Sequence, residues 1–178
     1  MLKKLAIVSA SVLMASAVAS GASAHVATGT YTLGTPGAQT LAVQHSISLS
    51  CEASLTLNVT GPHAGNISAG SLSPGSDQCS NVELRNFNWP VTIGNFSTNA
   101  AGAKTATFQV TNVGAKTLLG TCTGGVLSGT ISQAAAAGSP VIVSITSSSG
   151  WTSSPLPFLG CGVTGTMTMS PTPAISVP

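Results

Sequence analysis

Charged side chains are scarce in this sequence. Only 4% of its 178 residues are Asp, Glu, Lys or Arg, whereas about a quarter of the residues of an average soluble protein are charged. Binding to nucleic acid requires clustered Lys and Arg, so the sequence excludes a nucleic-acid partner, and an anionic membrane surface is disfavoured for the same reason. Weak mutual repulsion favours self-association of the chain and its adsorption at interfaces.

The signatures of common catalytic sites are also missing. The whole chain has three Asp and Glu residues, and glycoside hydrolysis needs two of them side by side. Neither the Gly-x-Ser-x-Gly nucleophile motif nor the Gly-x-x-x-x-Gly-Lys-Ser/Thr phosphate loop occurs. A calcium site needs several clustered oxygen ligands, and Asp77 stands alone. We therefore expect a protein that is not an enzyme and that uses no cofactor.

Aromatic residues make up only 4% of the chain, and two of them are tryptophans. Trp89 and Trp151 are candidates for an apolar surface that binds carbohydrate or hydrocarbon. A single Trp in a small domain more often closes the hydrophobic core, and that is the favoured interpretation here. Met167 and Met169 have strand spacing on an apolar face and are expected in the core as well.

The first 24 residues have the pattern of a secretory signal peptide. Lys3 and Lys4 precede an apolar stretch over 5–18, and Ala22-Ser23-Ala24 is a typical cleavage site. The apolar stretch is too short to span a bilayer, although an uncleaved anchor is the alternative. We expect one secreted domain over 25–178 that is extracellular or on the cell surface, with the periplasm as an alternative. Without Lys3 and Lys4, its formal charge is close to zero.

The most regular pattern runs from Ser46 to Thr60, where every odd position is apolar and every even position is polar. Strict alternation predicts a half-buried β-strand, because successive side chains of a strand point to opposite faces. At about 3.3 Å per residue this strand would span roughly 45 Å, which is long for one straight strand. We expect it to bend near Ala53 and to serve two strands or two sheets.

The rest of the domain predicts roughly eight to ten short strands and no long helix. The alternation changes phase at Arg85-Asn86, which indicates a bulge or tight turn. Pro90 lacks an amide hydrogen, so its strand is expected at an edge or kinked. Many short strands separated by turns predict an all-β fold, an antiparallel β-sandwich with Greek-key or jelly-roll connections. A closed barrel is the alternative.

The four cysteines are expected to form disulfides, because an exported protein folds in an oxidising compartment. Four cysteines allow three pairings. We favour the sequential one, Cys51 with Cys79 and Cys122 with Cys161. A metal site built on cysteines is disfavoured, because no Cys-x-x-Cys pair occurs and the cysteines share the phase of core residues.

Cleavage after Ala24 would make His25 the new N-terminus, which gives a rival hypothesis. The α-amino group and the imidazole of His25 could chelate copper, with His45 or His63 as a further ligand. Nitrogen ligands suit square-planar Cu(II), and copper enzymes with a terminal histidine on a β-sandwich are built this way. No His-x-His pair supports the hypothesis, so ordinary strand and loop roles are favoured for His45 and His63.

Several segments together resemble the Pra family of small secreted bacterial proteins, which are described as protein activators of alkane oxidation. The resemblance covers most of the domain and rests on the order and spacing of four segments. They are Ser48-Leu49-Ser50-Cys51, Cys79 followed by Asn88-Trp89-Pro90-Val91-Thr92, Cys122 in a Gly/Thr-rich turn, and Leu159-Gly160-Cys161-Gly162-Val163-Thr164-Gly165. It implies an extracellular accessory role in growth on hydrocarbons, by emulsification or uptake at the oil or cell surface, and it supplies no catalytic residues.

A structural subunit of a surface fibre or biofilm matrix is the second functional hypothesis. Chaperone–usher pilins are also secreted, disulfide-bonded sandwiches rich in Ser, Thr, Gly and Ala. The near-terminal tyrosine that is usual in pilins is missing, because the sequence ends Ala174-Ile175-Ser176-Val177-Pro178. The interfacial role is therefore preferred over the fibre.

Overall fold

The structure is a computed structural model that describes residues 23–35, 41–45, 48–73, 78–155 and 160–177. Most of the predicted signal peptide, residues 1–22, lies outside the described residues. No helix in the described part of the chain is long and apolar enough to cross a membrane.

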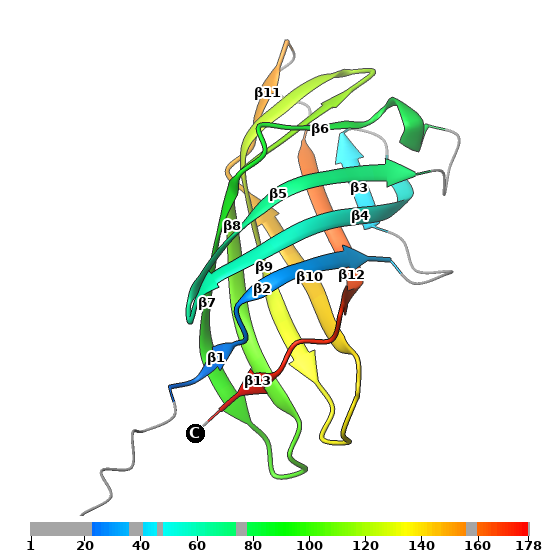
Figure 1. The fold of residues 1–178 in the computed structure, drawn as a ribbon. Helices are drawn as coiled ribbons and strands as arrows, with labels where there is room; N and C mark the ends of the chain where they lie inside the picture. Colours follow the sequence, from blue (N-terminus) through cyan, green and yellow to red (C-terminus); the bar gives the residue numbers. More distant parts are fainter. Residues whose placement is uncertain (1–22, 36–40, 46–47, 74–77, 156–159, 178) are drawn as a thin grey trace, which may run out of the picture.

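The described residues form thirteen strands and one short 3-10 helix, η1 (Cys79–Asn81) (Figure 1). The strands are β1 (His25–Val26), β2 (Gly29–Gly34), β3 (Leu41–His45), β4 (Ser48–Gly61), β5 (Ala64–Ser73), β6 (Glu83–Arg85), β7 (Trp89–Thr98), β8 (Lys104–Thr117), β9 (Gly120–Gln133), β10 (Val141–Ser149), β11 (Thr152–Ser154), β12 (Cys161–Ser170) and β13 (Ile175–Ser176). The predicted class, all-β with antiparallel strands and two disulfides, is confirmed.

The strand pairing closes on itself into a barrel. The ring runs β2, β4, β5, β7, β8, β9, β10 and β12, and β12 pairs again with β2. This order follows the sequence, so the connections are those of an up-and-down meander and not the expected Greek key or jelly roll. Alternation shows which face of a strand is buried but not which strand lies beside it, so the closed barrel could be named only as an alternative.

Strand β4 is the long alternating stretch, and its apolar positions 51, 53, 55, 57 and 59 are all buried. One edge of β4 serves two strands, as expected: β3 pairs with residues 48–51 and β2 with residues 54–59. Ala53 lies next to the change of partner, where its amide donates to Thr35 Oγ1 at 3.0 Å and its carbonyl accepts from the Thr35 amide at 3.0 Å. β4 stays one continuous strand through this point.

The inside of the barrel is a packed apolar core. Trp89, Met167 and Met169 are buried in it, as the favoured interpretation predicted. A cavity of about 30 Å³ lies among these side chains, about the volume of one water molecule. This cavity is too small for anything larger than a water-sized molecule, so these side chains serve to hold the fold together.

A small ribbon of β1 and β13 covers one end of the barrel (Figure 1). Each strand has two residues, and they place Val26 and Ile175 in the core with 0% and 1% of their surface exposed. We call this the capped end. The β8–β9 turn lies at the opposite end, together with both disulfides, and we call that the disulfide end.

Candidate interfacial site

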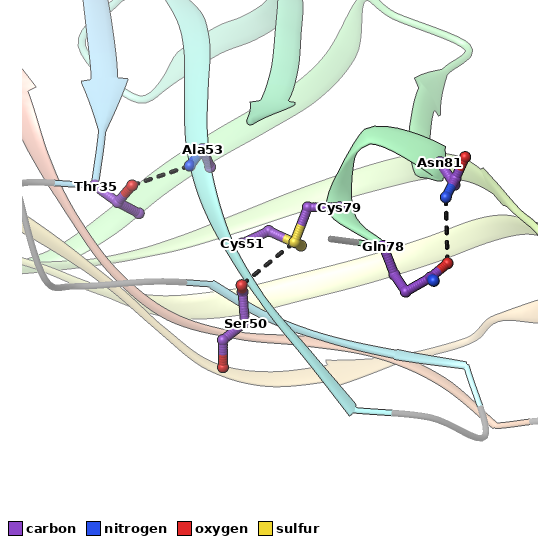
Figure 2. The surroundings of a disulfide bond; sticks show 7 residues. All are labelled: Thr35, Ser50, Cys51, Ala53, Gln78, Cys79 and Asn81. Atoms are coloured by element: carbon purple, nitrogen blue, oxygen red, sulfur yellow. Dashed lines mark hydrogen bonds between the residues drawn. A yellow bond between two sulfur atoms is a disulfide. The ribbon is translucent and has the colours of Figure 1, made fainter. Parts of the chain in front are cut away.

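Two disulfides brace the barrel at the disulfide end. Cys51 of β4 is bonded to Cys79 of η1 with a Cα–Cα distance of 5.6 Å, and Cys122 of β9 is bonded to Cys161 of β12 at 6.2 Å. The predicted pairing is confirmed. Figure 2 shows the first bond, with the Cys79 sulfur 3.3 Å from the Ser50 carbonyl oxygen; this is a packing contact, because a disulfide sulfur carries no hydrogen.

The β8–β9 hairpin extends beyond the ring at this end. Pairing of β8 with β7 starts at Val110 and runs toward the capped end, so the outer part of β8 has lost that neighbour. There β6 pairs with residues 114–116 of β8, and β11 pairs with residues 121–123 of β9. Bulges between Val110 and Ala115 reorient the hairpin before it reaches its turn. The outer hairpin is thus held on both edges.

Two leucines form the turn of this hairpin. Thr117 and Gly120 are the last paired residues, and Leu118 and Leu119 connect them. Thr117 Oγ1 accepts from the Leu119 amide at 3.1 Å and lies 3.2 Å from the Gly120 carbonyl oxygen, to which it donates. Leu118 is 70% exposed and Leu119 is 40% exposed. Within the residues that the structure describes, no other large apolar side chain is exposed to this degree.

Turn chemistry does not explain why these two residues are leucine. Two-residue hairpin turns favour Asn and Gly, because the favoured turn types need a positive φ. Neither Leu118 nor Leu119 has a positive φ. Exposing them in water gains nothing for the fold, since the hydrophobic effect rewards burial. Because the two exposed leucines are adjacent and lie on a braced turn, this turn is the candidate contact surface.

A small charged group lies beside the hairpin. Glu83 of β6 is opposite Lys116 of β8, and Arg85 Nη2 donates to Glu83 Oε2 at 2.6 Å. The hydrogen bond from Arg85, followed by the positive charges of Arg85 and Lys116, holds the pKa of Glu83 below its usual value. Three of the six charged residues of the expected domain, 25–178, are gathered here.

The two tryptophans do not form an open binding surface. Trp89 is 2% exposed, and its Nε1 donates to the Arg85 carbonyl at 2.8 Å while its ring stacks on Phe87 at 5.0 Å. The hypothesis that Trp89 lines a ligand surface is therefore wrong. Trp151 is partly buried and packs against the core over Gly125, where an added Cβ would lie 2.5 Å from the indole ring. Its buried Nε1 has no hydrogen-bond partner among the described residues.

The histidines considered for copper make separate contacts. His25 Nδ1 donates to the Ser23 carbonyl at 2.6 Å. His63 Nδ1 donates to the Ile93 carbonyl at 3.1 Å, and its ring meets the Phe96 ring edge-on at 5.7 Å. The backbone of His45 pairs with Cys161 in β12. The described residues contain no group of three His, Cys, Asp or Glu side chains that could hold a metal ion.

The leucine turn was not predicted as a site from the sequence. The available signal was two adjacent apolar residues that break the alternation between Thr117 and Gly120. Adjacent apolar residues next to a glycine are equally common where a strand enters the core, so the signal becomes specific only once the exposure of the turn is known.

Comparisons with known proteins give one family. The sequence model of the family described as alkane oxidation protein activator PraA/PraB-like matches residues 1–177. The searches of curated proteins and of solved structures found no match.

Proposed function

Because the chain belongs to the PraA/PraB-like family of alkane oxidation protein activators, we propose that it is a non-enzymatic accessory factor that acts at the hydrocarbon–water interface or at the cell surface during growth on alkanes. In this proposal it emulsifies the hydrocarbon or aids its uptake. The observation that carries the proposal is the exposed pair Leu118 and Leu119 on a braced turn.

The free energy gained when Leu118 and Leu119 leave water determines how strongly one copy of the protein would adsorb to an apolar phase. Full burial of a leucine side chain is worth about 1.5–3 kcal/mol, so the exposed parts of Leu118 and Leu119 together offer about that amount. This corresponds to roughly a 10- to 100-fold gain in partitioning. One turn therefore supports reversible adsorption of each copy, and coverage of a droplet depends on many copies.

The bracing of the turn favours insertion of the leucines over their collapse onto the protein. β6, β11 and the Cys122–Cys161 bond hold the outer hairpin, so little chain entropy is lost when the turn enters an apolar phase. Elsewhere on the barrel, the outer face of β12 carries the neutral hydroxyl groups of Thr164, Thr166 and Thr168. Such a face stays hydrated without repelling neighbouring copies.

The two disulfides fit a protein that folds outside the reducing cytoplasm. Secretion to the medium or to the cell surface is part of the proposal, since an interfacial role requires contact with extracellular hydrocarbon.

The fibre and copper hypotheses have less support. The path of paired strands ends in β6 and β11, which have three residues each and offer little edge for the addition of a strand from another copy. His25, His45 and His63 belong to β1, β3 and the β4–β5 turn, and the described side chains include no group of three His, Cys, Asp or Glu that could hold a metal ion.

The proposal is tested with the double variant Leu118→Ser/Leu119→Ser in a dodecane–water system. We expect the wild type to lower the interfacial tension and to stabilise an emulsion, and the variant to need roughly 10- to 100-fold more protein for the same effect. The fold should be unchanged, because both side chains are exposed.

The matched control is Ala135→Ser/Ala136→Ser in the β9–β10 turn, where both alanines are exposed at the capped end. It should behave as the wild type. Equal loss in both double variants would show that adsorption does not use the leucine turn. Fibres in negative-stain micrographs of the wild type, with no change in tension, would support the structural subunit instead.

A further inference from the structure

A second surface lies away from the leucine turn, on the outside of β7, β8, β9 and β10. It is an open groove of about 540 Å³, within the range of ligand-binding clefts. It is lined by Thr92, Ile93, Gly94, Asn95, Thr107, Phe108, Gln109, Ser128, Gly129, Thr130 and Thr146. The proposed interfacial function does not use this groove, so a role for the groove is independent of that function.

Strand register arranges the polar side chains of the groove in two rows. Paired residues on neighbouring strands lie side by side, about 4.8 Å apart across the sheet. The first row is Gly94, Thr107 and Thr130, and the second is Thr92, Gln109 and Ser128. The rows put hydroxyl and amide groups at regular intervals across three strands, with a gap at Gly94 where no side chain projects.

Two bulges border the groove. On β7 the register shifts between Gly94 and Ser97, and Asn95 takes a positive φ of 48°. Asn95 Nδ2 then donates to Thr107 Oγ1 at 3.0 Å. On β10 the register shifts between Ile145 and Ser147, and the extra residue, Thr146, donates from Oγ1 to the Ser128 carbonyl at 3.3 Å. Bulges redirect side chains at binding sites, and here they fix both rims.

The central side chains keep free hydrogen-bonding capacity. Gln109, Ser128 and Thr130 make no side-chain hydrogen bond within the described part of the protein. Together they offer amide and hydroxyl donors and acceptors. None of the described residues that line the groove is charged. The ligand that fits is therefore neutral, with hydrogen-bonding groups of both kinds.

We propose that this groove binds a neutral polysaccharide. Sugar hydroxyls donate and accept hydrogen bonds, which matches Gln109, Ser128 and Thr130, and the C–H faces of sugar rings match the methyl groups of the threonines that line the groove, Thr92, Thr107 and Thr130. A phosphate or sulfate would find no cation, and an alkane would leave these polar groups without partners. Extracellular or cell-surface glycan is the chemical class that this arrangement recognises.

The test is calorimetric titration of the full chain with three neutral hexasaccharides: cellohexaose, maltohexaose and mannohexaose. We expect at least one to bind, with a sulfated hexasaccharide binding more weakly. Thr130→Val removes one hydroxyl at nearly constant shape and should weaken binding about fivefold. Gly94→Ala adds a methyl group to the floor, and no atom lies within 4 Å of the new Cβ, so the fold is kept while the groove is narrowed.

The control is Thr32→Val on β2, an exposed strand threonine outside the groove, which should bind as the wild type does. The absence of binding to all three neutral sugars, stronger binding of the sulfated one, or equal effects of Thr130→Val and Thr32→Val would overturn the proposal. A change in sedimentation caused by Thr130→Val or Gly94→Ala would also overturn it, because the face would then be a contact between copies. Leu118→Ser/Leu119→Ser should leave sugar binding intact, which separates this inference from the interfacial one.

Discussion

The Nζ of Lys104 donates a hydrogen bond to the carbonyl oxygen of Ile175 at 2.6 Å, so the first residue of β8 holds the last strand of the chain. Ile175 pairs in turn with Val26, and both side chains are buried in the core. A two-residue ribbon has few backbone bonds of its own. The charge-assisted bond from Lys104 therefore supports the cap of the barrel.

Replacing Lys104 with Met should loosen this cap and leave the barrel folded. Loss of one bond to a charged donor predicts about tenfold faster hydrogen exchange at Val26 and Ile175, with exchange in β4 and β5 unchanged. Lys116→Met, at an exposed position of β8, is the control and should not affect the cap. If exchange in the cap is the same in both variants, the Lys104 bond does not hold it.

Removing either disulfide should destabilise the protein by a similar amount. The bonds span 28 and 39 residues of sequence, for which the chain-entropy model gives about 3.5–4 kcal/mol each. Paired serine variants, Cys51→Ser/Cys79→Ser and Cys122→Ser/Cys161→Ser, should therefore show similar losses in urea unfolding. Cys122→Ser/Cys161→Ser should also increase exchange in the outer β8–β9 hairpin, whereas the other pair should not.

The two tryptophans should differ in what they contribute. Trp89→Phe removes a buried hydrogen bond to the Arg85 carbonyl and leaves a cavity, which should cost about 2–4 kcal/mol in the free energy of unfolding. Trp151→Phe loses packing but no hydrogen bond, because its Nε1 has no partner among the described residues, and should cost about 1 kcal/mol. A larger cost at Trp151 would contradict the roles assigned to the two side chains.

The pKa of Glu83 should lie below its ordinary value of 4.5 because Arg85 donates to it. A carboxyl group with a lowered pKa in the folded state stabilises the fold above its unfolded pKa. That contribution is lost as the pH falls through the folded value. An NMR titration of the Glu83 carboxyl should give this lowered midpoint, and Arg85→Met should raise it. A midpoint that is unchanged in Arg85→Met would show that the ion pair does not form in solution.

The sequence predicted those parts of the fold that depend on local pattern. Alternation located β4 and its buried face, and the phase change at Arg85-Asn86 marked a real turn, where Asn86 has a φ of 59°. The sequential cysteine pairing was also right. Of the two expectations for Pro90, the edge position is wrong, because β7 is a central strand with β5 and β8 on either side. It tolerates Pro90 because pairing with β8 begins only at Val91.

Features that depend on strands meeting across the barrel could not be predicted. Closure depends on β12 reaching β2, and no local pattern in either strand encodes its neighbour. The exposure of Leu118 and Leu119 follows from the length of the β8–β9 hairpin beyond β7. The groove that we propose to bind polysaccharide arises where side chains from β7, β8 and β9 come into register. In the sequence, each of these side chains is an ordinary Thr, Ser or Gln of a strand.

The up-and-down order of the strands also determines the order in which strand pairs and disulfides can form during folding. Each strand of the ring pairs with the next along the chain, except at the closure, where Thr32 meets Ser170. Local hairpins form early because their loops are short, and the long-range contact comes last. A chain that emerges N-terminus first can therefore form Cys51–Cys79 while the rest follows, whereas Cys122–Cys161 must wait for β12. The barrel and the braced leucine turn are then completed together, only after nearly the whole chain has emerged.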